Sequence, residues 1–159
     1  MLNEKKLDTA LLKGKIRFEL FDEKGNIKQV VEKDNTFMAV GDAHVADQLA
    51  ATENEAKMGW IAIGTSTTAF SAASTALTSE LDRNALAAGY PEQGAGAADN
   101  DVIYKASWAT GDGTGAITEA GIFNSSANGT MLAASTFPVI NKGASDTLTI
   151  TWTVTCGAS

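Results

Sequence analysis

Hydrophobic and polar side chains alternate most regularly in the segment 148–156. The apolar positions are Leu148, Ile150, Trp152, Val154 and Cys156, and threonines stand between them. A period of two is typical of a β-strand with one buried face, because successive side chains point to opposite sides of a sheet. We therefore predict a strand here, with Cys156 on the buried side. The side with Thr149, Thr151 and Thr153 is either solvated or a flat surface that another subunit covers.

The N-terminal third shows the same alternation on a smaller scale. Residues 15–20 alternate, residues 22–26 are turn formers, and residues 27–32 return as a second strand, which predicts a β-hairpin. Residues 1–14 have only weak periodicity, which fits a turn of helix or an arm that becomes ordered on a partner. We therefore expect an arm and hairpin over 1–33 and a separate body over 34–159.

The middle of the chain changes period. Large apolar residues recur at helical spacing over residues 37–50, which predicts one short helix. Residues 59–64 are apolar and bounded by glycine, as in a buried strand. Leu77 and Leu81 are four residues apart, which fits a single helical turn. Residues 85–100 lack a pattern and are expected to form a long loop.

The second half predicts further strands at short spacing, at 102–108, 117–124 and 130–137, the last of them stopped by Pro138. Taken together, the pattern predicts a mainly β protein. The expected architecture is an antiparallel β-sandwich with one short helix, at about residues 37–50, packed at an end or edge. Trp60, Trp108 and Trp152 are expected to share one core.

Composition and charge narrow the class of protein. A length of 159 residues suits one domain, and a single cysteine excludes an intramolecular disulfide. No apolar run has the length of a signal peptide or a membrane span, so we expect a soluble protein of intracellular origin that does not bind membranes. The net charge is −7, which argues against nucleic-acid binding, because that needs a concentrated basic surface.

The charge is uneven along the chain. Residues 1–33 hold eight of the 12 basic residues and have a local charge of +2, whereas the remainder has −9. This leading segment could dock on an acidic neighbour, or it could be a hairpin with ordinary solvated charges. The candidate protein-contact residues are Lys5, Lys6, Lys13, Lys15 and Arg17, together with Thr149, Thr151 and Thr153.

Residues that could carry chemistry are few. His44 is the only histidine, so a histidine-based metal site lacks ligands. The glycine-rich run 111–115 is not followed by a lysine, which favours a hairpin turn over a phosphate loop. Glu119 lies mid-strand and is expected to make a structural hydrogen bond or to lie at the surface. We therefore predict a protein that is not an enzyme, with no cofactor and no metal.

Several segments together resemble a family of small virion proteins of tailed bacteriophages. The segments are Gly59-Trp60-Ile61-Ala62-Ile63-Gly64-Thr65, Leu77 with Glu80-Leu81-Asp82-Arg83, Ala116 to Asn124, Met131-Leu132-Ala133, and Asn141-Lys142-Gly143 with Asp146 to Val154. The resemblance covers roughly residues 35–156. It implies a structural component of a virion and supplies no catalytic residues.

The resemblance leaves two functions open. The first is a decoration or cement protein on the outside of the phage head, assembled in the host cytoplasm. Its partners would be the major capsid protein or other virion proteins and further copies of itself, in a cyclic oligomer with a trimer favoured. The second is a tail-fibre or baseplate module for host attachment, with the 85–100 loop as the contact. We favour the first, because 159 residues leave no room for a long fibre shaft.

Overall fold

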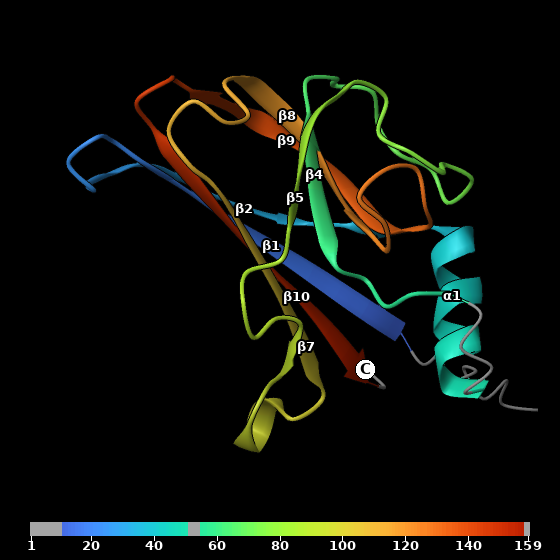
Figure 1. Ribbon diagram of the computed structural model, residues 1–159. Helices are drawn as coiled ribbons and strands as arrows, with labels where there is room; N and C mark the ends of the chain where they lie inside the picture. Colours follow the sequence, from blue (N-terminus) through green and yellow to red (C-terminus); the bar gives the residue numbers. More distant parts are fainter. Residues whose placement is uncertain (1–10, 51–54, 158–159) are drawn as a thin grey trace, which may run out of the picture.

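The structure is a computed structural model that describes residues 11–50 and 55–157. Two antiparallel five-stranded sheets pack face to face (Figure 1). Sheet A has the strand order β2 (Ile27–Asp34), β1 (Leu11–Phe21), β10 (Thr147–Gly157), β7 (Asp101–Trp108), β6 (Glu92–Gln93). Sheet B has the order β3 (Thr36–Phe37), β9 (Met131–Lys142), β8 (Gly115–Phe123), β4 (Trp60–Gly64), β5 (Glu80–Ala85). The predicted β-sandwich is confirmed.

The one α-helix of the described residues, α1 (Ala39–Ala50), lies at one end of the sandwich (Figure 1). Its start falls two residues after the predicted one, because Thr36 and Phe37 pair with β9 as strand β3. Gly41 lets the helix approach closely, since a Cβ at this position would overlap the backbone of Leu132. The expected short helix at an end of the sandwich is thus present.

The hairpin and the body share one sheet. Strand β1 pairs with β10 along its whole length, from Leu11 opposite Gly157 to Phe21 opposite Thr147. The segment expected as an arm therefore divides in two. Residues 11–14 belong to β1, whereas residues 1–10, with Lys5 and Lys6, lie outside the described residues.

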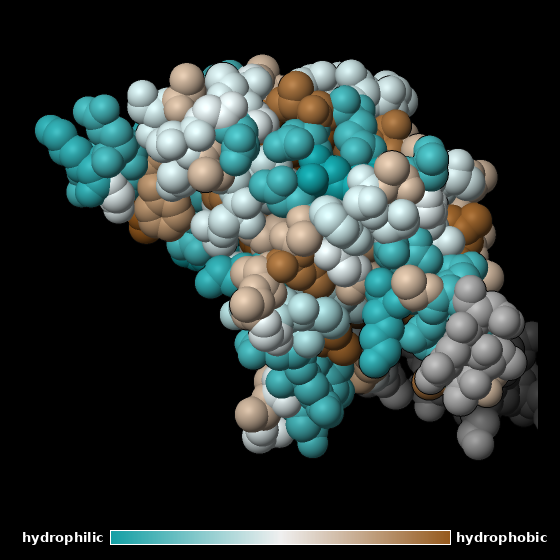
Figure 2. Space-filling view, in the orientation of Figure 1, coloured by the Kyte–Doolittle hydropathy of each residue, from teal (hydrophilic) through white to brown (hydrophobic). Residues whose placement is uncertain are grey.

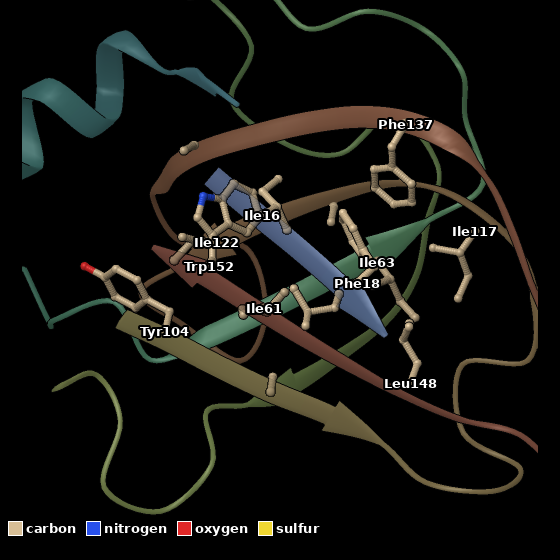
Figure 3. Close-up of a cluster of buried hydrophobic side chains, with 14 of the residues drawn as sticks. Ile16, Phe18, Ile61, Ile63, Tyr104, Ile117, Ile122, Phe137, Leu148 and Trp152 are labelled. Carbon is tan, nitrogen blue, oxygen red and sulfur yellow. The ribbon is translucent and has the colours of Figure 1, made fainter. Parts of the chain in front are cut away.

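The main core lies between the two sheets and is built from the inward side of each alternating strand (Figure 3). Trp108 and Trp152 are both fully buried there, and the rings of Phe18 and Phe137 pack with centroids 4.1 Å apart. Each large apolar side chain buried in this way contributes roughly 1.5–3 kcal/mol to folding. The apolar face predicted for the 148–156 strand is therefore a central part of this core.

A second apolar cluster covers the opposite face of sheet B. It includes Met38, Ala62, Phe123 and Met131, and Leu77 packs onto it from the 65–79 segment. Trp60 packs against this second cluster, so the prediction of one core for all three tryptophans was wrong. Strand β4 is covered on both faces, and alternation alone does not tell which of two covered faces looks toward the other sheet.

Three local predictions also differ from the structure. Residues 74–81 form no helical turn, and residues 80–85 are the edge strand β5, whose polar sequence hid it. The expected loop 85–100 contains β6 and the 3₁₀ turn η1 (Gly96–Ala98). Cys156 is exposed, contrary to the prediction. It follows the inward alternation of β10, but it lies near the end of the strand, beyond the core.

Pro138 does not stop its strand, as was predicted, because β9 continues to Lys142. The pairing of β8 with β9 shifts register between Glu119, opposite Thr136, and Ile117, opposite Ile140. Pro138 lies inside this irregular stretch, where the regular ladder does not require its missing N–H.

Both corners of the sandwich are closed by hydrogen bonds between the sheets. At one corner, Ser135 Oγ donates to the carbonyl of Asp34 at 2.8 Å, and Gln29 Nε2 donates to the carbonyl of Val139 at 3.1 Å. At the other, the Ala87 N–H donates to the carbonyl of Lys105 at 2.8 Å. These bonds cover parts of strand edges that would otherwise offer free backbone groups.

Candidate interaction surface

The outer face of sheet A carries mostly polar side chains. Strand β10 runs through its middle and presents half-buried threonines, because the alternate residues of this strand enter the core. Neighbouring strands place charged side chains beside them. In register, Thr151 lies between Arg17 of β1 and Lys105 of β7, and Thr149 lies between Glu19 and Ser107.

The structure brings together two groups of candidate residues that were predicted separately. Lys15 lies directly opposite Thr153 and Arg17 opposite Thr151, and Lys13 follows on the same face opposite Thr155. All three basic side chains are exposed. The remaining candidates, Lys5 and Lys6, lie outside the described residues.

Sequence reasoning missed the acidic side chains and the further lysine of this face. Glu32 and Asp34 lie on β2 opposite Arg17 and Lys15, and Lys105 lies on β7. The alternation in residues 102–108 carried the signal for Lys105. The position of Glu32 and Asp34 follows only from the pairing register of the hairpin, which the sequence pattern does not specify to one residue.

The charges on this face form ion pairs. An amino group of Arg17 donates to Glu32 Oε1 at 3.0 Å, and Lys15 Nζ lies 3.6 Å from Glu32 Oε2. The hydrogen bond from Arg17, and then the charge of Lys15, lower the pKa of the Glu32 carboxyl below its ordinary value of 4.5. The same hydrogen bond raises the pKa of Arg17. The face is therefore charged at neutral pH but close to balanced.

Glu119 has a structural role, which the sequence left open as one of two possibilities. Its side chain is fully buried on the covered outer face of sheet B. It accepts hydrogen bonds from the backbone N–H groups of Thr78, at 3.1 Å, and Ser79, at 2.7 Å. The carboxylate thereby holds the 65–79 segment on the sheet and has no opening toward a substrate.

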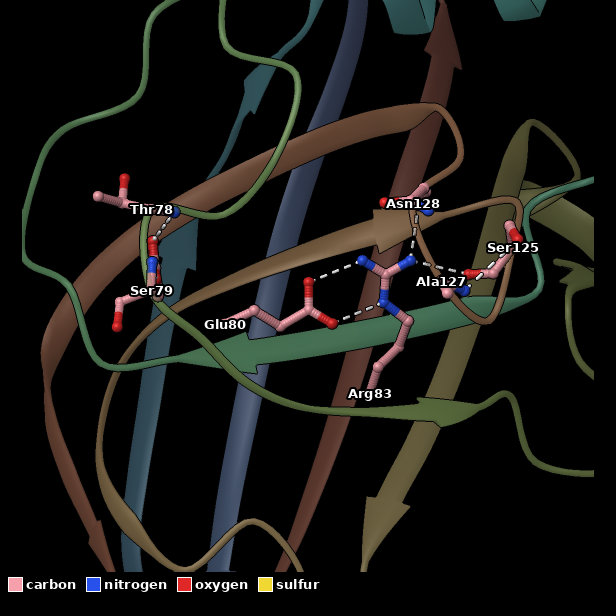
Figure 4. Close-up of polar contacts among 8 residues, drawn as sticks. Thr78, Ser79, Glu80, Arg83, Ser125, Ala127 and Asn128 are labelled. Carbon is pink, nitrogen blue, oxygen red and sulfur yellow. Dashed lines mark hydrogen bonds and ion pairs between the residues drawn. The ribbon is translucent and has the colours of Figure 1, made fainter.

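Arg83 of β5 makes a second structural cluster (Figure 4). Its guanidinium forms two hydrogen bonds with Glu80, at 2.9 and 2.7 Å, and donates to the carbonyls of Ser125 and Asn128. It also lies 3.8 Å from the centre of the Phe123 ring. Because these contacts occupy the guanidinium within the chain, it fastens the turn at 124–130 to β5.

His44 is buried, as expected for a structural histidine, and its Nδ1 lies 3.0 Å from Glu55 Oε2. Asn124 Nδ2 donates to the same carboxylate at 3.3 Å. Within residues 11–50 and 55–157, no group of three or more His, Cys, Asp or Glu side chains is placed to hold a metal ion. The histidine therefore links α1 to the segment before β4.

An apolar groove of about 280 Å³ opens between α1 and the neighbouring end of the sandwich. Its lining includes Leu49, Leu132, Val154, Tyr104 and Cys156. Burial raises the pKa of the Tyr104 hydroxyl to about 12, so this group stays neutral at physiological pH. His44, whose Nδ1 lies 3.0 Å from Glu55 Oε2, also lines the groove, so its only histidine is already engaged with a carboxylate among the described residues.

The surface seen in Figure 2 is a mixture of polar and apolar residues, and hydrophobic side chains appear as separate small patches. Among the exposed large apolar residues, Val30 and Val139 are partly covered, whereas Leu49 of α1 is 83% exposed. No helix in the described part of the chain is long and apolar enough to cross a membrane.

Comparison of the chain with protein-family models, with curated proteins and with solved structures finds no match. The resemblance to phage virion proteins thus stays a prediction that depends on the sequence segments alone.

Proposed function

We propose that this chain is a structural protein of a phage virion that decorates the outside of the head and contacts neighbouring copies there. The observation that carries the proposal is the outer face of sheet A, where the candidate contact residues of two distant segments meet on one exposed surface. The buried polar groups described above support it, because Glu119, Arg83 and His44 are all engaged in holding the fold.

Immunogold labelling tests this location. An antibody against the purified chain is applied to intact virions of the phage that encodes it, with virions lacking the gene as the control. Gold over the whole head is the expected result. Gold confined to the tail, or no gold on any part of the particle, would contradict the proposal.

A tail-fibre or baseplate module for host attachment is the second candidate. The segment with β6 and η1 favours it, because this segment projects from the sandwich beyond β7 and its residues are mostly exposed (Figure 1). Under this function, the purified chain should bind host cells, and replacing exposed residues Glu92 and Gln93 with alanine should weaken that binding. Labelling at the tail in the experiment above would favour this candidate.

A truncation can separate attachment from folding. Residues 1–10 precede β1, whereas Leu12 packs against the core and residues 11–14 pair with β10. Under the decoration proposal, deletion of residues 1–10 should weaken binding to heads that lack the protein, with thermal unfolding measured in parallel as the control for folding. Deletion of residues 1–14 should lower the melting temperature as well. Equal head binding by the full chain and the shorter deletion would exclude residues 1–10, with Lys5 and Lys6, from the contact.

The expected cyclic oligomer, with a trimer favoured, depended on exposed strand edges. The closed corners remove part of that reason, because edges of β9 and β7 are already bonded within the chain. The number of copies stays a prediction, and sedimentation equilibrium of the purified chain measures it.

A further inference from the structure

Adjacent strands of the outer face of sheet A carry opposite charges. Strand β1 presents Lys13, Lys15 and Arg17 in a basic row that ends at the half-buried Glu19, and strand β2 presents an acidic row of Glu32 and Asp34. The register places Lys15 level with Asp34 and Arg17 level with Glu32. All four residues are exposed, so each row is available to a second molecule.

We propose that these two rows form a self-complementary contact that binds a second copy of the chain. A two-fold axis parallel to the strands, between β1 and β2, places β1 of one copy over β2 of the other at the same level. Lys15 then faces Asp34 of the partner subunit, and Arg17 faces Glu32 of the partner subunit. Symmetry repeats each attractive pair, as in any isologous interface.

A contact centred on the threonine row is less favourable. With the axis along β10, β1 lies over β7, and Arg17 faces Lys105 of the partner subunit, because both are level with Thr151. Like charges placed against each other suppress association. Lys13 gains Asp101 of the partner subunit in this arrangement, which offsets the repulsion only in part, whereas both facing pairs of the first arrangement are attractive. The charge pattern thus selects the rows on β1 and β2.

The ion pairs within one copy prepare the contact. Glu32 is already held by Arg17 at 3.0 Å, so two copies would join their pairs into a closed ring of four charges. Such a contact is polar and screened by salt, which predicts a weak dimer that forms at the high local concentration of a particle surface. For this biological role, the inference rests on the proposed function, but its test uses the purified chain alone.

The test is a charge exchange between two variants, measured by sedimentation equilibrium. In Arg17→Glu the facing rows carry extra negative charge, and in Glu32→Arg they carry extra positive charge. Each variant alone should dimerise about tenfold or more weakly than the wild type, because its own copies repel. An equimolar mixture should regain dimers, since Glu at 17 then faces Arg at 32 of the other molecule. Ion pairs inside a chain do not change on mixing, so this recovery is specific for contact between copies.

Lys105→Glu is the matched control, since it changes a charge on the same face outside the proposed contact. It should leave the dimerisation constant unchanged. If it strengthens association, the contact lies over β10 and the proposal is wrong.

A monomeric wild type at millimolar concentration, undisturbed dimers of both variants, or a mixture without recovery would also overturn the proposal. Should Arg17→Glu fail to fold by circular dichroism, Lys15→Glu with Asp34→Lys gives the same exchange. A negative result leaves head binding, which immunogold measures, untouched.

Discussion

At the scale of single residues, the polar end of Trp152 depends on one amide. The indole Nε1 donates to Asn35 Oδ1 at 2.8 Å, and the Asn35 N–H donates to the carbonyl of Gly14. A Cβ at Gly14 would overlap the Asn35 amide. We expect Gly14→Ala to displace this amide and lower the free energy of unfolding by about 1–3 kcal/mol, measured by urea denaturation. The matched control is Gly59→Ala, whose Cβ would meet nothing closer than 3.8 Å. Equal losses in both variants would contradict this explanation.

Glu119 gives a second residue-scale prediction. Because its carboxylate accepts two backbone N–H groups of the 65–79 segment, Glu119→Gln turns one acceptor into a donor that faces a donor. We expect a loss of roughly 2 kcal/mol in unfolding free energy. Hydrogen exchange should show faster exchange at Thr78 and Ser79, with protection in β10 retained. Unchanged exchange at these two amides would show that the carboxylate does not hold the segment.

Alternation predicted the side of a residue better than its burial. It placed Trp152 in the core correctly, and it placed Cys156 on the same side, where the residue is nevertheless exposed. Burial also requires an opposing layer, and the core does not reach the end of β10. The prediction for Trp60 was wrong for a related reason, because both faces of its strand are covered.

At the scale of strands, Thr151 offers a test whose result depends on the sign of the charge introduced. Its cross-strand neighbours are Arg17 and Lys105. Thr151→Glu should therefore be neutral or stabilising, and Thr151→Lys should destabilise, with a difference of a few tenths to about 1 kcal/mol. Thermal unfolding at low and high salt measures this, and the difference should shrink as salt screens the charges. Equal effects of both replacements would show that the neighbouring charges do not reach residue 151.

The sequence pattern missed strands that lack a regular hydrophobic alternation and form because of their contacts with neighbouring strands. Strand β5 is an edge strand with charged side chains, which protects an edge but removes the alternating signal. The part of β9 after Pro138 was missed because the irregular pairing that accommodates proline arises from its contact with β8. The sequence pattern likewise predicted only part of the contact surface. It did not place the acidic row of β2 there, because that position depends on the pairing register of the hairpin.

For the whole molecule, acid should weaken the fold. The hydrogen bond from Lys28 is the main cause that lowers the pKa of Asp146 below its ordinary value of 3.8, and the hydrogen bond from the Gly143 N–H adds to it. The pKa of Glu32 is likewise lowered from its ordinary value of 4.5. A carboxyl with a depressed folded-state pKa stabilises above its unfolded pKa and loses that effect as the pH falls through the folded value. We expect the unfolding free energy to decline as the pH drops through 4.5 and 3.8 and to continue falling below.

Lys28→Met should flatten this acid profile and reduce stability at neutral pH, because it leaves the buried Asp146 without the ammonium that lies 2.7 Å away. Lys24→Met, at an exposed lysine in the turn of the same hairpin, is the control and should keep the wild-type profile. Superimposable profiles for both variants would show that the Lys28 pair does not contribute.

The pairing of β1 with β10 also sets the order in which the chain can fold as it is made. The hairpin of β1 and β2 leaves the ribosome early, with Ile16, Phe18 and Leu20 on the side that will later enter the core. Its principal strand neighbour, β10, is synthesised last among the described strands. Sheet A is therefore completed only at the end of translation, and contacts between such distant segments favour slow folding, in milliseconds to seconds. Until then, the apolar side of the nascent hairpin lacks its neighbouring strand and is open to premature association.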